Sequence, residues 1–402
     1  MKYNKTIAFI ISFCFSTNLF SQNIKNDILQ INKNTLILEM RIGEGSGLKG
    51  DFIIAGNSGS LAVNDNGDII ITDEYKIKIY DKNGKPLKVI GRKGQGPGEY
   101  ETFPKINLGL KGYLTGYNDL FDNSIYNLYS EKYVIIKTKR ITNDIIYEKY
   151  IKNKKLKDVT IYDINSVNNL YPINANEMLC SILIKDYFNE TPYKAILKVS
   201  DNNIEEIYFS KEPEYIITKN RSIVNNGLLG RFFWGVTSNG QIIIYNSDTD
   251  EHSNNKTSKY NIYIIDIVKG NKNKLDHNFQ PEVFKKEYID NLIRNRKVFK
   301  LSSEFFSKKE EVTLKSKKYM YALSKLLIEN NYIFAYLKER EREKYLVDVF
   351  DISKMSYVKS FEIPLDFPTN IINNGYLYCK TDDENGYPEI RKYKITSNIY
   401  GK

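Results

Sequence analysis

The chain has 402 residues and a formal net charge of +10, with 59 lysine and arginine residues against 49 aspartate and glutamate residues. No concentrated basic stripe with interleaved aromatic residues accompanies this mild excess, so the composition argues against a nucleic-acid-binding protein. Only two histidines are present, His252 and His277, each in a polar loop between expected strands. They argue against a histidine zinc site or a histidine-based catalytic triad.

Residues 1–21 have the pattern of a secretory signal peptide. Lys2 and Lys5 precede an apolar run over residues 7–15, and a polar-to-small exit ends at Ser21, after which we expect cleavage. The run is too short to span a bilayer, and no later segment offers about 18 uninterrupted apolar residues. We therefore expect an exported protein of the periplasm or cell surface, with no transmembrane helix after the signal peptide.

The segment 59–91 predicts a four-stranded antiparallel meander. Its strands are expected at 59–65, 68–73, 76–81 and 86–91. Asn66-Gly67 and Asn83-Gly84 form tight hairpin turns, because asparagine and glycine tolerate the positive φ angles that such turns require. Four antiparallel strands within about 35 residues make one blade of a β-propeller.

Weaker copies of this pattern follow along the chain, marked by alternating apolar residues and turn signals. They cover about 104–141, 159–209, 222–275, 320–364 and 365–399. The last copy has only three good strands, and we expect the segment 35–42 to supply the fourth, since this pairing closes the ring and removes open strand edges. The sequence therefore predicts an all-β fold, a six-bladed β-propeller, with residues 22–402 as a single domain.

One segment breaks the β pattern before the fifth blade. Pro281 opens a stretch in which apolar residues from Phe284 to Leu292 recur at helical spacing, which predicts a helix of about 15 residues. A capping box at 307–310 indicates a second short helical piece. We expect residues 281–317 to form a partly helical insertion that covers an apolar patch, and a functional lid is the alternative.

Cys180 and Cys379 remain after processing, and an oxidising compartment would permit a disulfide between them. The third and sixth blades lie on opposite sides of the expected ring, so we expect two free, largely buried thiols. Cys14 raises the alternative of a lipoprotein, but the bulky Phe13 stands where lipidation needs a small residue.

The stretch 79–100 resembles the signature of six-bladed β-propeller proteins exported by Bacteroidetes, which are relatives of the NHL-repeat propellers. The stretch 375–395 is similar to the last blade of that family. The resemblance implies a six-bladed ring in the cell envelope and brings no general biochemical activity with it. Many members look like lipoproteins, and this chain departs from them because it lacks a lipobox.

The loop that runs from Arg92 to Glu99 is the most distinctive local motif. Gly94 and Gly96 free backbone amides while Arg92 and Lys93 supply positive charge, so an anion could bind there. The loop fits neither a phosphate-binding Walker motif nor a dinucleotide fingerprint. The favoured alternative is structural: the glycines shape a tight crossing between blades, and Glu99 caps backbone amides.

A second candidate site combines Arg231 with Trp234, the only tryptophan in the chain, and with the two phenylalanines between them. Such a group could stack on a sugar or anchor a partner, and aromatic packing between blades explains it equally well. Oxygen-rich turns at 65–68 and 382–385 do not complete the spacing of a known calcium loop. We expect no metal, no cofactor and no catalytic residue.

The absence of a catalytic constellation favours a binding or scaffold module, not an enzyme. We expect loops around the central channel to hold an envelope glycan, a peptide or a partner protein. The alternative is a propeller hydrolase or lyase that acts on carbohydrate or a small lactone. Inward-facing Asp, Glu or Asn side chains around the channel would favour the enzyme, whereas an apolar channel with an aromatic patch would favour binding.

Overall fold

The computed structural model describes residues 36–401 apart from gaps at 44–46, 57–58, 119–122, 155–167, 187–190, 214, 218–222, 226–229, 253–257, 288–289, 291–311, 313–314, 317, 338–343 and 365–368. The expected signal peptide and most of the expected insertion at 281–317 lie outside the described residues.

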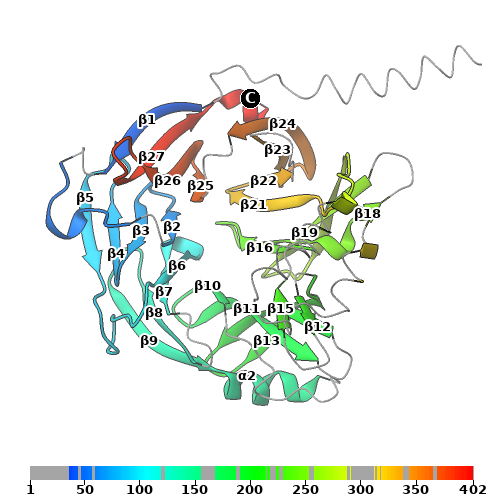
Figure 1. The fold of residues 1–402 in the computed structure, drawn as a ribbon. Helices are drawn as coiled ribbons and strands as arrows, with labels where there is room; N and C mark the ends of the chain where they lie inside the picture. Colours follow the sequence, from blue (N-terminus) through cyan, green and yellow to red (C-terminus); the bar gives the residue numbers. More distant parts are fainter. Residues whose placement is uncertain are drawn as a thin grey trace, which may run out of the picture.

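Six antiparallel sheets stand around a common axis and confirm the predicted propeller (Figure 1). The first blade consists of β2 (Leu61–Val63), β3 (Ile69–Asp73), β4 (Lys76–Tyr80) and β5 (Pro86–Ile90). The second consists of β6 (Lys105–Leu108), β7 (Leu114–Tyr117), β8 (Asn123–Tyr129) and β9 (Ile135–Thr142). The third consists of β10 (Asn168–Pro172), β11 (Glu177–Asp186), β12 (Thr191–Ser200) and β13 (Ile204–Lys211).

The remaining blades follow the same order. The fourth consists of β16 (Phe232–Val236), β17 (Gln241–Asn246), β19 (Ser258–Asp266) and β20 (Lys272–Phe279), and the short β18 (Glu251–His252) also pairs with β19. The fifth consists of β21 (Leu323–Glu329), β22 (Tyr332–Leu337), β23 (Lys344–Asp351) and β24 (Ser356–Pro364). The sixth consists of β25 (Thr369–Asn373), β26 (Tyr376–Asp382), β27 (Pro388–Ile395) and β1 (Leu36–Ile42).

The sixth blade is assembled from both ends of the described chain. The segment expected to supply its fourth strand holds β1, which pairs antiparallel with β27 from Leu36 opposite Ile395 to Ile42 opposite Ile390. This pairing covers the outer edge of β27 and joins the first blade to the last.

Each of the six interfaces between successive blades holds a cluster of buried apolar side chains among the described residues. The side chains of strand β3 alternate between two interfaces. Ile69 and Ile71 pack in the cluster shared with the sixth blade, whereas Ile70 packs in the cluster shared with the second blade. Both faces of the strand are therefore buried, and it reads as a continuous apolar run.

The helices are short and lie outside the sheets. The described 3₁₀ helices with full bounds are η2 (Gly50–Phe52), η3 (Leu110–Gly112), η4 (Ile151–Asn153), η6 (Ser247–Thr249) and η7 (Ser397–Tyr400). The α-helix with described bounds, α2 (Asn143–Lys149), lies between the second and third blades, whereas the sequence placed its helix before the fifth. Its start is capped by the Thr142 hydroxyl, which accepts from the Ile145 N–H, and its Ile146 is fully buried.

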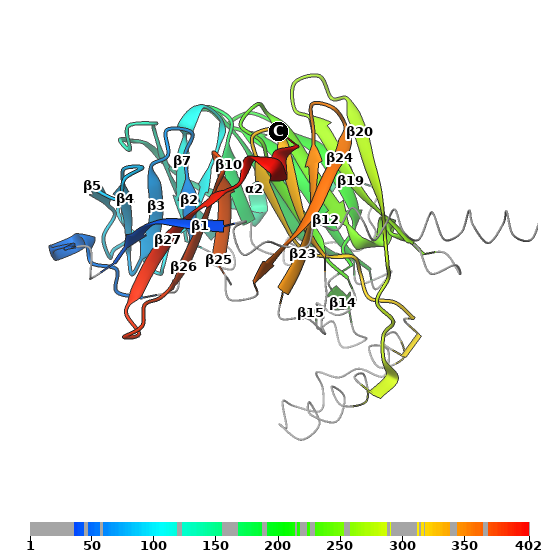
Figure 2. The same cartoon turned by 90° about the horizontal axis from the view of Figure 1, so that it is seen from above.

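Outside the blades, β14 (Tyr215–Ile217) and β15 (Ile223–Asn225) form a two-stranded sheet, which lies at the lower edge of the ring in the perpendicular view of Figure 2. Cys180 and Cys379 are free and buried, as expected. The two histidines do not lie in loops, because His252 belongs to β18 and His277 to β20. Among the described residues, no helix is long and apolar enough to cross a bilayer.

Candidate functional site

A cavity of about 270 Å³ lies at the centre of the ring, where the innermost strand of every blade contributes to its wall. These strands are β2, β6, β10, β16, β21 and β25, and all six surround the centre in Figure 1. The apolar part of the wall includes Leu61, Val63, Leu108, Val236, Ile328 and Ile372. Polar side chains share the wall, among them Asn64, Asn107, Thr237 and Asn373, so the cavity offers both apolar and polar surface.

Two aromatic rings from neighbouring blades form one part of this wall. Trp234 of β16 and Tyr171 of β10 meet edge to face, with ring centroids 5.1 Å apart. The indole Nε1–H of Trp234 is buried and has no hydrogen-bond partner among the described residues. A buried N–H without a partner costs about 1–3 kcal/mol, so the burial of this ring carries a price in stability.

Side-chain amides stand at the ends of the inner strands β16, β21 and β25 or on the turns that follow them, and two of these residues, Asn330 and Asn373, line the cavity. We call Asn239, Asn330, Asn331, Asn373 and Asn374 the amide rim. Asn330 and Asn374 adopt φ angles of 47° and 52°, a left-handed conformation that asparagine tolerates better than most residues. The same property that makes asparagine a good turn residue therefore places amides around the mouth.

The amide rim links four blades through side-chain hydrogen bonds. Asn239 donates to Asn331, and Asn330 donates to Asn374, each with an N···O distance of 3.4 Å. Asn374 in turn donates to the main-chain oxygen of Asp65 at 3.1 Å, which carries the chain of contacts to the first blade. Asn373 is held more tightly, because its Nδ2 lies 2.6 Å from the Val63 carbonyl oxygen.

Glu329 is a carboxylate at this mouth, and its oxygens are already engaged. They accept hydrogen bonds from the Gly375 N–H at 2.5 Å and from the Tyr400 hydroxyl at 2.6 Å. Burial, together with this carboxylate, raises the pKa of the Tyr400 phenol well above its usual range. Glu329 therefore connects η7 to the fifth and sixth blades through its hydrogen bonds. Among the described residues of the cavity wall, Asp65 is the exposed acid.

The predicted anion loop lies between β5 and β6, away from the cavity wall. The Glu99 carboxylate accepts from the Gly96 N–H at 2.8 Å and from Arg92 Nε at 2.7 Å, and these contacts hold the pKa of Glu99 below its ordinary value. The same carboxylate fills the space beside Gly94, while Lys93 lies over the Tyr75 ring at 5.2 Å from its centroid. Glu99 thus occupies the position that an added anion would take.

The second predicted pair is separated in the structure. Trp234 lines the cavity, whereas Arg231 precedes β16 and donates from Nε to the Tyr321 hydroxyl at 3.2 Å. The Arg231 guanidinium also lies 5.7 Å from the centroid of the Tyr321 ring. Only the tryptophan of this pair is placed to meet a ligand in the channel.

A buried polar cluster between the fourth and fifth blades went unpredicted. Asp348 accepts from the Tyr260 hydroxyl at 2.6 Å and from the Ser360 hydroxyl at 2.5 Å, and His277 Nε2 lies 3.7 Å from the same carboxylate. Burial raises the pKa of Asp348, and burial lowers the pKa of His277 despite the nearby carboxylate. The serine bonds to the carboxylate and His277 stacks on Tyr357 at 4.2 Å, so the cluster lacks the serine-to-histidine contact that a hydrolytic triad needs.

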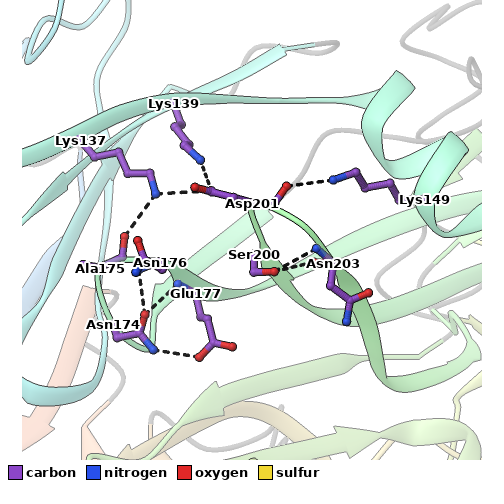
Figure 3. A network of polar contacts seen from close by, with 10 residues as sticks. All are labelled: Lys137, Lys139, Lys149, Asn174, Ala175, Asn176, Glu177, Ser200, Asp201 and Asn203. Carbon is purple, nitrogen blue, oxygen red and sulfur yellow. Dashed lines mark hydrogen bonds and ion pairs between the residues drawn. The ribbon is translucent and has the colours of Figure 1, made fainter.

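A basic cluster joins the second and third blades (Figure 3). Lys137 and Lys139 of β9 point toward the Asp201 carboxylate, and Lys149 of α2 donates to the Asp201 main-chain oxygen at 3.0 Å. The hydrogen bond from Lys139 lowers the pKa of Asp201, whereas burial and the charge of Lys139 lower the pKa of Lys137. Lys137 also reaches the Ala175 carbonyl oxygen at 3.3 Å, so the cluster ties the two blades together.

Among the residues that the structure describes, no group of three or more His, Cys, Asp or Glu side chains is arranged to hold a metal ion. The described residues of the cavity wall include no carboxylate pair that is free for acid and base chemistry, because Glu329 is engaged and Asp65 is the one exposed acid among them.

No protein-family model and no curated protein matches the chain. A solved structure of a candidate exported protein from Bacteroides fragilis aligns at 11% identity and a TM-score of 0.49, over 92% of this chain and 98% of that one. A DUF4221 family member from Bacteroides vulgatus aligns at 12% identity and a TM-score of 0.48, over 90% and 98%. An oligogalacturonate lyase in complex with manganese aligns at 9% identity and a TM-score of 0.38, over 86% and 93%.

These likenesses are too distant to carry an argument about function. Two of the structures come from Bacteroides, whereas the expected relation to NHL-repeat propellers stays a prediction. The geometry of the channel is therefore the basis for a functional conclusion.

Proposed function

We propose that this chain is an exported binding module of the periplasm or cell surface, and that it takes its ligand into the mouth of the central channel. The observation that carries the proposal is the composition of the cavity wall, which combines apolar strand residues, the Trp234–Tyr171 pair and an uncharged amide rim. Concave, mostly apolar sites with a few converging polar groups are the usual form of a small-ligand site.

The wall carries Asp65, Glu329 and several asparagines, the residue types that would favour an enzyme, but the engagement of Glu329 supports binding better than catalysis. A glycosidase needs two carboxyl groups that face each other about 5–10 Å apart, one of them free to move a proton. Glu329 is held by a backbone amide and a tyrosine hydroxyl, and Asp348 is buried between blades away from the cavity wall. A hydrolase or lyase is therefore the weaker proposal.

Trp234 makes the test direct, because it is the only tryptophan and lines the cavity. The mature chain, residues 22–402, is titrated with neutral oligosaccharides, acidic oligosaccharides and short uncharged peptides, while tryptophan emission and the melting temperature are followed. We expect at least one class to change the emission and to raise the melting temperature, since a ligand that binds only the folded state stabilises it. Recovery of the probe unchanged, checked by mass spectrometry, separates binding from turnover.

A blocking variant locates the site. Ser238 is exposed and lines the cavity, so Ser238→Phe is expected to obstruct the mouth and abolish the emission change. Ser397→Phe places the same ring on η7, at an exposed serine outside the cavity wall, and is expected to bind as the parent does. Equal binding by both variants, or no response to any probe class, contradicts the proposal.

A further inference from the structure

Resting on the proposed function, we propose that the ligand is an uncharged glycan end, with one sugar ring against Trp234 and its hydroxyl groups hydrogen-bonded to the amide rim. Three features of the channel mouth lead to this ligand class.

The first feature is the chemistry of the rim. A side-chain amide offers both donors and an acceptor, and a sugar hydroxyl likewise donates and accepts. The contacts from Asn239 to Asn331 and from Asn330 to Asn374 are long, at 3.4 Å, and these four residues are exposed. Such bonds are weak and can be exchanged for ligand hydroxyls, while the amides remain roughly in place.

The second feature is the charge of the wall. Among its described residues the ionisable acids are Asp65 and Glu329, and no lysine or arginine belongs to it. An acidic ligand would find no cation inside the cavity and would approach an exposed carboxylate at the rim. The channel mouth therefore selects against acidic sugars and against a free peptide C-terminus.

The third feature is the aromatic wall beneath the rim. Trp234 and Tyr171 both line the cavity and offer an apolar surface to the C–H groups of a sugar ring. The volume of about 270 Å³ lies just below the range of about 300–1,000 Å³ that is usual for small-molecule sites, which suits one ring and not a folded segment.

The test compares three probes of similar length on the mature chain: maltotetraose, tetragalacturonate, and an acetylated and amidated tetrapeptide of serine and glycine. We expect maltotetraose to change Trp234 emission and to raise the melting temperature. We expect the affinity for tetragalacturonate to be lower by a factor of about ten or more. Asn330→Ala is expected to weaken maltotetraose binding about threefold to tenfold, the loss of one or two hydrogen bonds. Asn202→Ala, at an exposed asparagine of the β12–β13 turn, is the matched control and leaves binding unchanged.

The outcomes separate the two proposals. If tetragalacturonate binds as tightly as maltotetraose, or the peptide alone changes the emission, the assignment to an uncharged glycan is overturned while the channel remains a binding site. If none of the three probes changes either signal, the glycan assignment is overturned. The wider probe classes of the first titration then test whether the channel binds any ligand. An unchanged affinity in Asn330→Ala overturns the role of the rim.

Discussion

Lys325 of β21 gives the fold a measurable alkaline pH dependence. Its largely buried ammonium group donates to the main-chain oxygen of Asn370 at 3.1 Å and to the side-chain oxygen of the same residue at 2.8 Å. Burial lowers the pKa of Lys325 from its ordinary value of 10.5 to about 8. The unfolded chain then binds this proton more tightly than the folded chain, so the free energy of unfolding rises with pH above 8. One pKa unit corresponds to about 1.4 kcal/mol, which gives a rise of about 2–3 kcal/mol by about pH 10.

The assay is urea unfolding at several values from about pH 7.5 to about pH 10, followed by circular dichroism. Lys325→Met keeps the apolar stem but cannot ionise, so we expect its curve to lack this rise. Buried tyrosines such as Tyr245 and Tyr260, whose pKa burial raises, lower the free energy of unfolding from about pH 9 upward, because the unfolded chain ionises first. They do so in the parent and the variant alike, so the contribution of Lys325 is the difference between the two curves. Lys394→Met, at an exposed position of β27, is the matched control. A rise of equal size in Lys325→Met and in the parent would refute the reasoning.

Three further predictions concern stability and are checked by chemical unfolding. Ile42→Ala removes buried methyl groups from the closing strand β1 and is expected to lower the free energy of unfolding by about 2–5 kcal/mol. A loss below about 1 kcal/mol would argue against tight packing where the ring closes. Both Gly94 and Gly270 have positive φ, 153° and 69°, so alanine is strained at either position. Gly94→Ala is expected to cost about 1–3 kcal/mol more than Gly270→Ala, because only at Gly94 does the added Cβ overlap the Glu99 carboxylate, and equal costs would contradict this. Asp348→Asn is expected to cost about 1–3 kcal/mol, since Tyr260 and Ser360 donate to different carboxylate oxygens and an amide keeps only one of these acceptors. An unchanged midpoint would argue against the buried cluster.

The blades could be predicted from the sequence because local signals, turn residues and apolar runs, determine their strands. In the first blade, Asn-Gly pairs mark the hairpin turns, although only their glycines, Gly67 and Gly84, adopt positive φ. Apolar runs such as 69–71 mark strands buried on both faces. Helix α2 could not be predicted, because its seven residues are too few to show a helical period. Its stability comes from the Thr142 cap and the burial of Ile146. His277 was assigned to a loop because β20 is an outer strand with a mostly polar sequence.

The candidate site could be predicted only in part. Trp234 was singled out by its rarity and its aromatic neighbours, and the strand it occupies does line the channel. The amide rim was missed because asparagine at a turn is a common local signal, and only the ring brings three such turns to one mouth. Arg231 was grouped with Trp234 by sequence distance, although three residues along a strand span about 10 Å and lead out of the cavity.

The pairing of β1 with β27 also bears on how the chain reaches its folded state. Leu36 and Ile395 are partners from opposite ends of the described chain, so this contact has to close one of the longest loops that the sequence allows. Until it forms, β27 presents an open edge that can pair with another molecule. We expect ring closure to be a late and slow step of folding. We also expect aggregation to increase when partly folded chains are present at high concentration.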